Sequence, residues 1–428
     1  MSLDLVLRNA ILTTGAQPVD IGVKAGRIVA IDREILTDAP ELPVGERLVF
    51  PGFVDSHLHL DKSCIMSRCC CCLGTLAEAI DEVAKAKADF SEEDVYKRGE
   101  ATLLKAIRHG TNRIRTHVEV DPRIGLTGFR AIRKLKKDYA SLIDLQICAF
   151  PQEGLLNDPG AEDVLMQACR QGADLVGGCP YTDNNPAGHV QAIFRIAKRF
   201  DMDIDFHLDF DLDSSWMHLD HVCANTILNG WGGRVTVGHV TKLSAVDPLR
   251  LEVLGARMAD LGIAVTVLPA TDLFLMGRDR TFDVPRGIAP ALRLQAMGVT
   301  CSVATNNVLN PFTPFGDCSL IRMANLYANV AAASTDADMQ GCFGMVSGNP
   351  AAIMGLDPSY GVEVGKPAHL VVLNCSSPVQ AVREIVQPLM GLRYGILSFT
   401  RPAATVHRAA SQDFSFLKRT FEKLVADS

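Results

Sequence analysis

The chain has 428 residues, which is too long for one ordinary domain but suits a barrel of roughly 250 to 300 residues with a smaller module. Its formal net charge is −7 and it has no basic block, which argues against nucleic acid as a partner. No signal peptide is recognisable, no run of about 18 apolar residues predicts a membrane span, and the 13 cysteines lack the spacing of a disulfide framework. We therefore expect a cytoplasmic protein with reduced thiols.

Both ends of the chain are predicted to form β-structure. Short apolar runs broken by glycine occupy residues 3–12 and 20–31, and residues 361–373 and 391–400 have the same character. Short strands at both ends of a chain with α/β alternation between them predict a small β-sandwich built from the two termini. We assign residues 1–50 and 361–428 to this composite module.

The middle of the chain, residues 51–360, alternates strands with helices. Strands are predicted at residues 48–54, 111–118, 142–150, 175–178, 202–207, 234–238, 263–268 and 299–305. Helices are predicted at residues 75–87, 186–200, 214–229, 247–261, 290–297 and 320–330, and a further helix opens at Ser91. Eight strands alternating with helices predict an α/β fold, a (β/α)8 barrel of the TIM type, whose active site occupies the C-terminal strand ends.

Four of the 11 histidines lie where these predicted strands end: His57, His59, His207 and His239. His57 and His59 are two positions apart, so a strand places both side chains on one face. Imidazoles gathered at the ends of parallel strands make a first-row metal site. From the His-X-His pair alone, a metal site and a pair of satisfied structural histidines are equally good interpretations.

The Pro-Gly-Phe-Val-Asp-Ser-His-Leu-His run at residues 51–59 resembles the start of the barrel in the amidohydrolase superfamily. Residues 116–121 and 150–154, together with His207 and His239, resemble the cytosine deaminase branch of that superfamily. The run at residues 59–63 is similar also to that of N-isopropylammelide isopropylaminohydrolase, a member of this branch. The resemblance covers nearly the whole chain.

This resemblance implies one divalent ion, Zn or Fe, held by His57, His59 and His207. It also implies that His239 either binds the ion or orients the attacking water and the substrate oxygen. Such an ion lowers the pKa of a bound water and supplies a nucleophile near neutral pH. Histidine suits both roles because a neutral imidazole can ligate a metal or exchange a proton.

Two positions depart from the family pattern. Asn306 stands where the family has an aspartate at the end of strand eight, and an amide has no charge and takes no proton near neutral pH. Phe210 stands where cytosine deaminases carry a glutamate that moves protons to the ring. The usual general base is therefore missing. We expect either Asp209, two residues after His207 on the same face, or Asp211 to replace it if burial raises its pKa, and His239 is the other group that could activate the water.

Three further residues are candidates for contact with the substrate. Lys62 is interpreted either as a group that donates a hydrogen bond to a ring carbonyl or protonates the leaving amine, or as the partner of an acid such as Asp61. Gln152 matches the position where the family binds the pyrimidine edge through an amide. Phe312 follows strand eight, where the family places an aromatic ring against the substrate. Asn306 is expected to contact the substrate as well.

These residues predict a metal-dependent hydrolase that cleaves a C–N bond of a small nitrogen heterocycle and releases ammonia or an amine. Three alternatives stay open: an enzyme that opens a cyclic amide or imide, a hydrolase that relies on carboxylates with little metal, and a non-catalytic binder of heterocycles on the same fold. A homo-oligomer is possible because relatives commonly associate.

Overall fold

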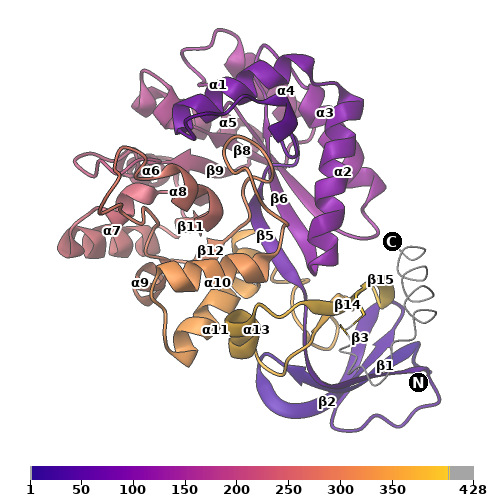
Figure 1. The fold of residues 1–428 in the computed structure, drawn as a ribbon. Helices are drawn as coiled ribbons and strands as arrows, with labels where there is room; N and C mark the ends of the chain where they lie inside the picture. The colour runs from indigo at the N-terminus through magenta and orange to yellow at the C-terminus, as the bar shows by residue number, and fades with distance from the viewer. Residues whose placement is uncertain (1, 403, 405–428) are drawn as a thin grey trace, which may run out of the picture.

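The computed structural model describes residues 2–402 and residue 404, and these form two sheets (Figure 1). The first sheet has eight parallel strands in the order β5 to β12. Their bounds are β5 Phe53–Leu58, β6 Thr111–Glu119, β7 Asp144–Phe150, β8 Leu175–Gly178, β9 Asp203–Leu208, β10 Val235–His239, β11 Ala264–Val267 and β12 Cys301–Val303. The predicted barrel is confirmed.

Asn306, just beyond β12, closes the barrel against β5. It pairs with Leu58, and its backbone N–H donates to the carbonyl of His57 at 2.8 Å. Its own carbonyl accepts from the backbone N–H of His59 at 3.0 Å. The closure thus sits next to the histidine pair, at the C-terminal end of the strands.

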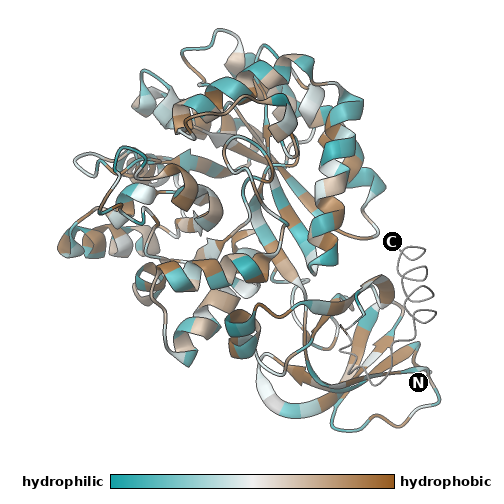
Figure 2. Ribbon diagram, viewed as in Figure 1, coloured by the Kyte–Doolittle hydropathy of each residue, from teal (hydrophilic) through white to brown (hydrophobic). Residues whose placement is uncertain are grey.

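Helices surround the barrel on its outer side (Figure 1). The helices of the described residues are α1 Leu76–Ala86, α2 Glu92–Arg108, α3 Thr127–Asp138, α4 Ala161–Arg170, α5 Pro186–Phe200, α6 Leu219–Asn229, α7 Pro248–Asp260, α8 Pro269–Leu275, α9 Ala291–Ala296, α10 Leu320–Val330, α11 Asp336–Gly344, α12 Gly348–Ile353 and α13 Pro378–Glu384. Figure 2 shows hydrophilic and hydrophobic residues alternating along the outer helices. In α3, for example, Phe129, Ile132 and Leu135 recur at helical spacing and are buried, so this face packs inward.

The first barrel strand begins later than predicted. Residues 48–50 belong to the end of β4 (Glu41–Phe50) in the other sheet, and β5 starts only at Phe53. Between them Gly52 has φ +95°, and a Cβ atom there would lie 2.4 Å from Nδ2 of Asn112. The chain therefore changes sheets at a position that only glycine tolerates.

The second sheet combines strands from both ends of the chain, as predicted. Its order is β15-β14-β13-β4-β1-β2-β3, and it has a hydrophobic cluster of its own. The strands not yet given are β1 Leu5–Leu12, β2 Gly15–Lys24, β3 Arg27–Asp32, β13 Leu370–Leu373, β14 Pro388–Arg393 and β15 Ile396–Thr400. The boundaries at residues 50/51 and 360/361 stay predictions, and residues 405–428 of the predicted module lie outside the described residues.

Within the described part of the chain, none of the helices combines the length and the apolar character needed to cross a membrane.

Candidate active site

Three of the four predicted histidines converge on one point inside the barrel mouth. Nε2 of His207 lies 3.1 Å from Nε2 of His57 and 3.2 Å from Nε2 of His59. Tetrahedral zinc with bonds of about 2.0–2.1 Å to nitrogen requires ligand atoms about 3.3 Å apart, so the spacing fits. All three rings are at most 2% exposed. Burial is the main cause that lowers their pKa values well below 6.5, and the neighbouring histidines and Lys62 lower these values further. Neutral imidazoles with converging nitrogens can hold one divalent ion.

His239 ends β10 and lies beside this group rather than in it. Its Nδ1 is 2.6 Å from Oδ1 of Asp272 in α8, and Asp272 Oδ2 accepts the backbone N–H of Leu268 at 3.2 Å. A carboxylate accepts a hydrogen bond, so Nδ1 of His239 carries the proton and Nε2 is left for other contacts. His239 is not among the residues whose spacing fits an ion, so its predicted ligation stays a prediction. The sequence prediction missed Asp272, which follows strand β11 in a short helix.

A second group of buried residues, also missed, supports the first. The ring of His117 from β6 stacks on that of His57 at 3.7 Å between centroids. Asp205 from β9 lies 3.4 Å from Nε2 of His117, and its other oxygen accepts from Arg115 at 2.8 Å. The spacing of His57, His117 and Asp205 would also fit an ion. The alternation of side chains along a strand could have identified them, because each lies two positions from another residue that faces the inside of the barrel.

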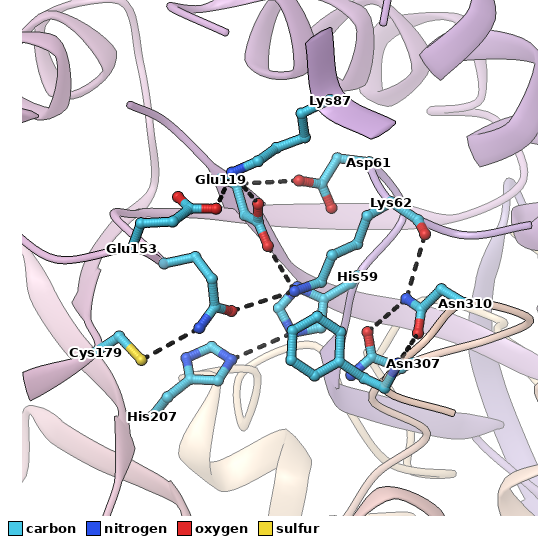
Figure 3. Close-up of polar contacts among 12 residues, drawn as sticks. His59, Asp61, Lys62, Lys87, Glu119, Glu153, Cys179, His207, Asn307 and Asn310 are labelled. Carbon is cyan, nitrogen blue, oxygen red and sulfur yellow. Dashed lines mark hydrogen bonds and ion pairs between the residues drawn. The ribbon is translucent and has the colours of Figure 1, made fainter. Parts of the chain in front are cut away.

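Lys62 reaches the cavity from the loop after β5. Its Nζ donates to Oε1 of Glu119 at 2.6 Å and to Oε1 of Gln152 at 3.2 Å, and it lies 4.3 Å from the ring centre of Phe312 (Figure 3). Lys62 therefore does pair with an acid, but the acid is Glu119 and not Asp61, which accepts the backbone N–H of Glu119 at 2.8 Å. Lys62 is 1% exposed, so its charge is balanced inside the protein.

A buried ion network continues from Glu119 to the surface. Lys87 lies 2.8 Å from the second oxygen of Glu119 and also pairs with Glu153 (Figure 3). It lies 2.9 Å from Asp121 as well. Burial, reinforced by the nearby Glu119, raises the pKa of Glu153 to about 7. Burial likewise raises the pKa of Asp61 to about 6. Sequence reasoning missed Lys87 and Glu119 because they are separated from Lys62 by tens of residues.

Asp209 is turned away from the converging imidazoles. Its Oδ1 accepts the backbone N–H of His218 at 2.8 Å and faces Nδ1 of His218 at 3.0 Å, and its Oδ2 accepts the N–H of Leu219 at 3.0 Å. The carboxylate therefore anchors the start of α6. The predicted role of Asp209 as general base gains no support from this geometry. Phe210, the next residue, packs against the ring of His239, with 3.8 Å between the two ring centroids.

Three asparagines after β12 form a hydrogen-bonded chain. Asn310 Nδ2 donates to Oδ1 of Asn307 at 2.7 Å, and Asn307 Nδ2 donates to Oδ1 of Asn306 at 3.0 Å. Asn306 Nδ2 is buried and has no hydrogen-bond partner among the described residues. The oxygen of Asn306 accepts one hydrogen bond and keeps a second lone pair, and its NH₂ group offers N–H donors.

The candidate residues line a small cavity in the mouth of the barrel. It is lined by His59, Lys62, Gln152, Tyr181, His207, Phe210, His239, Thr271, Asn307 and Phe312. The segment between β5 and α2 covers its mouth, where Ile65 and Val83 pack against Phe210 and Phe312. The predicted contacts Lys62, Gln152 and Phe312 thus meet two of the converging histidines in one closed space, from which water is largely excluded.

Known proteins share this architecture. The sequence model of the amidohydrolase family matches residues 104–389. N-isopropylammelide isopropyl amidohydrolase from Pseudomonas sp. (strain ADP) is 30% identical over 402 residues, 92% of this chain and 96% of that protein. Pterin deaminase from Rhizobium rhizogenes is 30% identical over 76% of this chain and 75% of that protein. The structure of 5-methylcytosine deaminase from Klebsiella pneumoniae superposes with a TM-score of 0.89 at 27% identity, covering 95% of this chain and 100% of that one.

Proposed function

Because the chain belongs to the amidohydrolase family, we propose that it hydrolyses the exocyclic C–N bond of a small nitrogen heterocycle and releases ammonia or an amine. The observation that carries this proposal is the convergence of three imidazole nitrogens beside a closed cavity lined by Lys62 and Gln152. The names of the relatives support it, since they act on a substituted triazine, a pterin and 5-methylcytosine.

The residues around the cavity have two roles: some bind the ion, and others transfer protons or contact the substrate. His57, His59 and His207 hold one divalent ion, Zn or Fe, which supplies the Lewis acidity that makes water a nucleophile near neutral pH. His239, oriented by Asp272, takes a proton from the attacking water at Nε2.

The other groups act on the ring. Lys62 protonates the leaving nitrogen, and Glu119 holds its ammonium group in place. Gln152 contacts the edge of the ring, and Phe312 packs against its face. Asn306 contacts the ring through its Nδ2, which is buried and has no hydrogen-bond partner among the described residues. We further propose a cytoplasmic enzyme that acts without nucleic acid and forms a homo-oligomer.

Metal analysis joined to a hydrolysis screen tests this function. We expect about one equivalent of zinc or iron per chain and release of ammonia from an aminopyrimidine or aminotriazine. His207→Asn removes the imidazole shared by both short contacts and should lower kcat/KM by on the order of 10³. The matched control is His221→Asn, because His221 is exposed on α6.

Three results would contradict the proposal. Hydrolysis that survives both metal removal and His207→Asn would show that carboxylates do the work. Formation of a ring-opened acid in place of ammonia would show cyclic amide hydrolysis. Binding of rings with no turnover in the metal-loaded protein would show a binding protein.

A further inference from the structure

Phe210 separates the cavity from a second, larger cleft that is open to solvent. The cavity is the space beside His59 and His207, and Phe210 is part of its lining. The outer cleft lies between the segment that follows β9, the end of α8 and the start of α1, and Phe210 is part of its lining too. None of the other described residues lines both spaces, so the Phe210 side chain is the partition between them.

The backbone before Phe210 turns this side chain over the mouth of the barrel. His207 faces the inside of the barrel, so a strand that continued from it would turn position 210 outward, because side chains alternate. Asp209 instead has φ +49°, a left-handed conformation that few residues other than glycine adopt. Both oxygens of its carboxylate accept backbone N–H groups at the start of α6, which holds the turn in place. The anchored turn directs Phe210 to the ring of His239.

The Phe210 ring is packed on several sides. It is 3% exposed, and its centroid lies 3.8 Å from that of the His239 ring. It shares one apolar cluster with Ile65 and Val83, which belong to the segment that covers the mouth, and with Leu275 of α8. Because close-packed interiors leave little room for another rotamer, the ring forms a fixed wall.

This wall stands next to the place of the proposed reaction. His239, which takes a proton from the attacking water, contacts Phe210. The leaving nitrogen is bonded to the carbon that this water attacks, so any group carried by that nitrogen begins close to His239 and Phe210. A short group fits inside the cavity, whereas a longer one meets the Phe210 ring.

We propose that Phe210 limits the length of the substituent that the leaving nitrogen can carry, because it closes the cavity against the outer cleft. This inference rests on the proposed hydrolysis of a heterocyclic C–N bond and adds a residue that determines its specificity. Beyond the ring the cleft is lined by Leu76, Leu275 and Met276, which pack in the same cluster as Phe210. These side chains suit an uncharged alkyl chain, which a smaller residue at position 210 would admit.

A series of N-alkyl derivatives with increasing chain length tests the inference. The parent ring is ammelide or cytosine, whichever the zinc-loaded protein hydrolyses faster, and its amino group carries a methyl, butyl or hexyl chain. Water replaces the amine at the ring carbon, so every member of the series gives the same ring product and one assay measures kcat/KM for all. We expect kcat/KM of the unmodified chain to fall about a hundredfold or more from methyl to hexyl, because the longer chain overfills a closed space.

Phe210→Leu and Phe210→Ala lower the wall in two steps. We expect the ratio of kcat/KM for the hexyl compound to that for the methyl compound to rise about tenfold in Phe210→Leu and about a hundredfold in Phe210→Ala. Activity on the methyl compound should fall in both variants, since His239 loses part of the ring against which it packs. Phe210→Leu removes fewer atoms, so it decides the question if Phe210→Ala does not fold.

The matched control is Phe129→Leu, the same change on the buried face of α3, which should leave the ratio unchanged. Two results would overturn the inference: an unmodified chain whose kcat/KM does not depend on chain length, or a steep dependence that persists in both Phe210 variants. Both results leave the proposed function intact, because the rings are still hydrolysed. Zinc-loaded protein that hydrolyses neither the parent rings nor their derivatives would contradict the proposed function and this inference with it.

Discussion

At the scale of single residues, the site combines neutral metal-binding groups with a cavity whose charges are paired. The three converging nitrogens of His57, His59 and His207 come from uncharged rings, because burial lowers their pKa values. Asn306 is a neutral amide, so it does not compensate the charge of an ion. An ion held here keeps most of its positive charge, which strengthens its action as a Lewis acid on water.

Substitution of Asp209 tests whether its carboxylate has a structural or a catalytic role. In Asp209→Asn the amide can still accept the N–H of His218 but places an NH₂ group against the N–H of Leu219. We expect the free energy of unfolding to fall by about 1–3 kcal/mol, because the start of α6 loses an acceptor. We expect kcat to fall less than about tenfold, with the metal content unchanged, since the carboxylate contacts no converging imidazole.

Urea unfolding and steady-state kinetics on the same Asp209→Asn preparation check this. The general-base role expected from the sequence requires the opposite pattern: kcat lower by orders of magnitude with little change in stability.

Residues with a local pattern could be predicted from the sequence, and their distant partners could not. The alternation of His57 and His59 is visible within three residues, and it placed them together correctly. Asp272 meets His239 from 33 positions away, and Glu119 meets Lys62 from 57 positions away. Such pairs depend on which strands become neighbours, which no local period encodes.

At the scale of elements, the same distinction holds for the helices. Ser91 accepts the N–H of Asp94, so the cap residue expected from the sequence does start α2, and Thr75 caps α1 in the same way by accepting the N–H of Glu78. The helix predicted to begin at residue 214 begins at Leu219 instead, because its first N–H groups are satisfied by Asp209 from the end of another element. A helix start supplied from elsewhere in the fold leaves no local signal.

The ion network that joins the loop before α2 to the ends of β6 and β7 makes stability depend on pH. The native state raises the pKa of Glu153 to about 7, from an ordinary value of 4.5, so it binds this proton more tightly than the unfolded chain does. The contribution is fully present below the unfolded pKa and is lost as the pH rises through about 7. We expect a loss of up to about 3 kcal/mol over this window.

Glu153→Gln should remove that part of the pH dependence, because the amide does not titrate and its oxygen can still accept from Lys87. Urea unfolding between about pH 5 and pH 8 measures it, with Glu252→Gln on the exposed side of α7 as the control. Parallel curves for Glu153→Gln and the unmodified chain would show that Glu153 ionises normally.

At the scale of the whole molecule, the two sheets have different tasks. The second sheet attaches through Arg393 of β14, which reaches Asp144 at the N-terminal start of β7, where Arg113 also pairs with Asp144 at 2.8 Å. This contact lies at the opposite end of the strands from His57 and His207. The residues that line the cavity therefore all come from the barrel, and the second sheet contacts the barrel at the opposite end of its strands.

The ion site connects distant parts of the barrel. His57 and His59 come from the first barrel strand, and His207 comes from the fifth, so a bound ion ties together segments that are about 150 positions apart. Anything that binds the native state but not the unfolded chain stabilises it, and zinc at 100 to 1,000 times its Kd should add about 3 to 4 kcal/mol. Removing the metal with a chelator should therefore lower the melting temperature, and zinc should restore it.

Calorimetric melting of chelated and zinc-reloaded protein tests this at fixed pH and ionic strength. His207→Asn should melt at the same temperature with and without zinc, because it lacks the shared imidazole, while His221→Asn should keep the full response. Melting temperatures of the unmodified chain that do not respond to zinc would mean that the three rings do not hold an ion in solution. A response to zinc that survives in His207→Asn would place the ion elsewhere. His117, which stacks on His57, and Asp205 would then be the next residues to substitute.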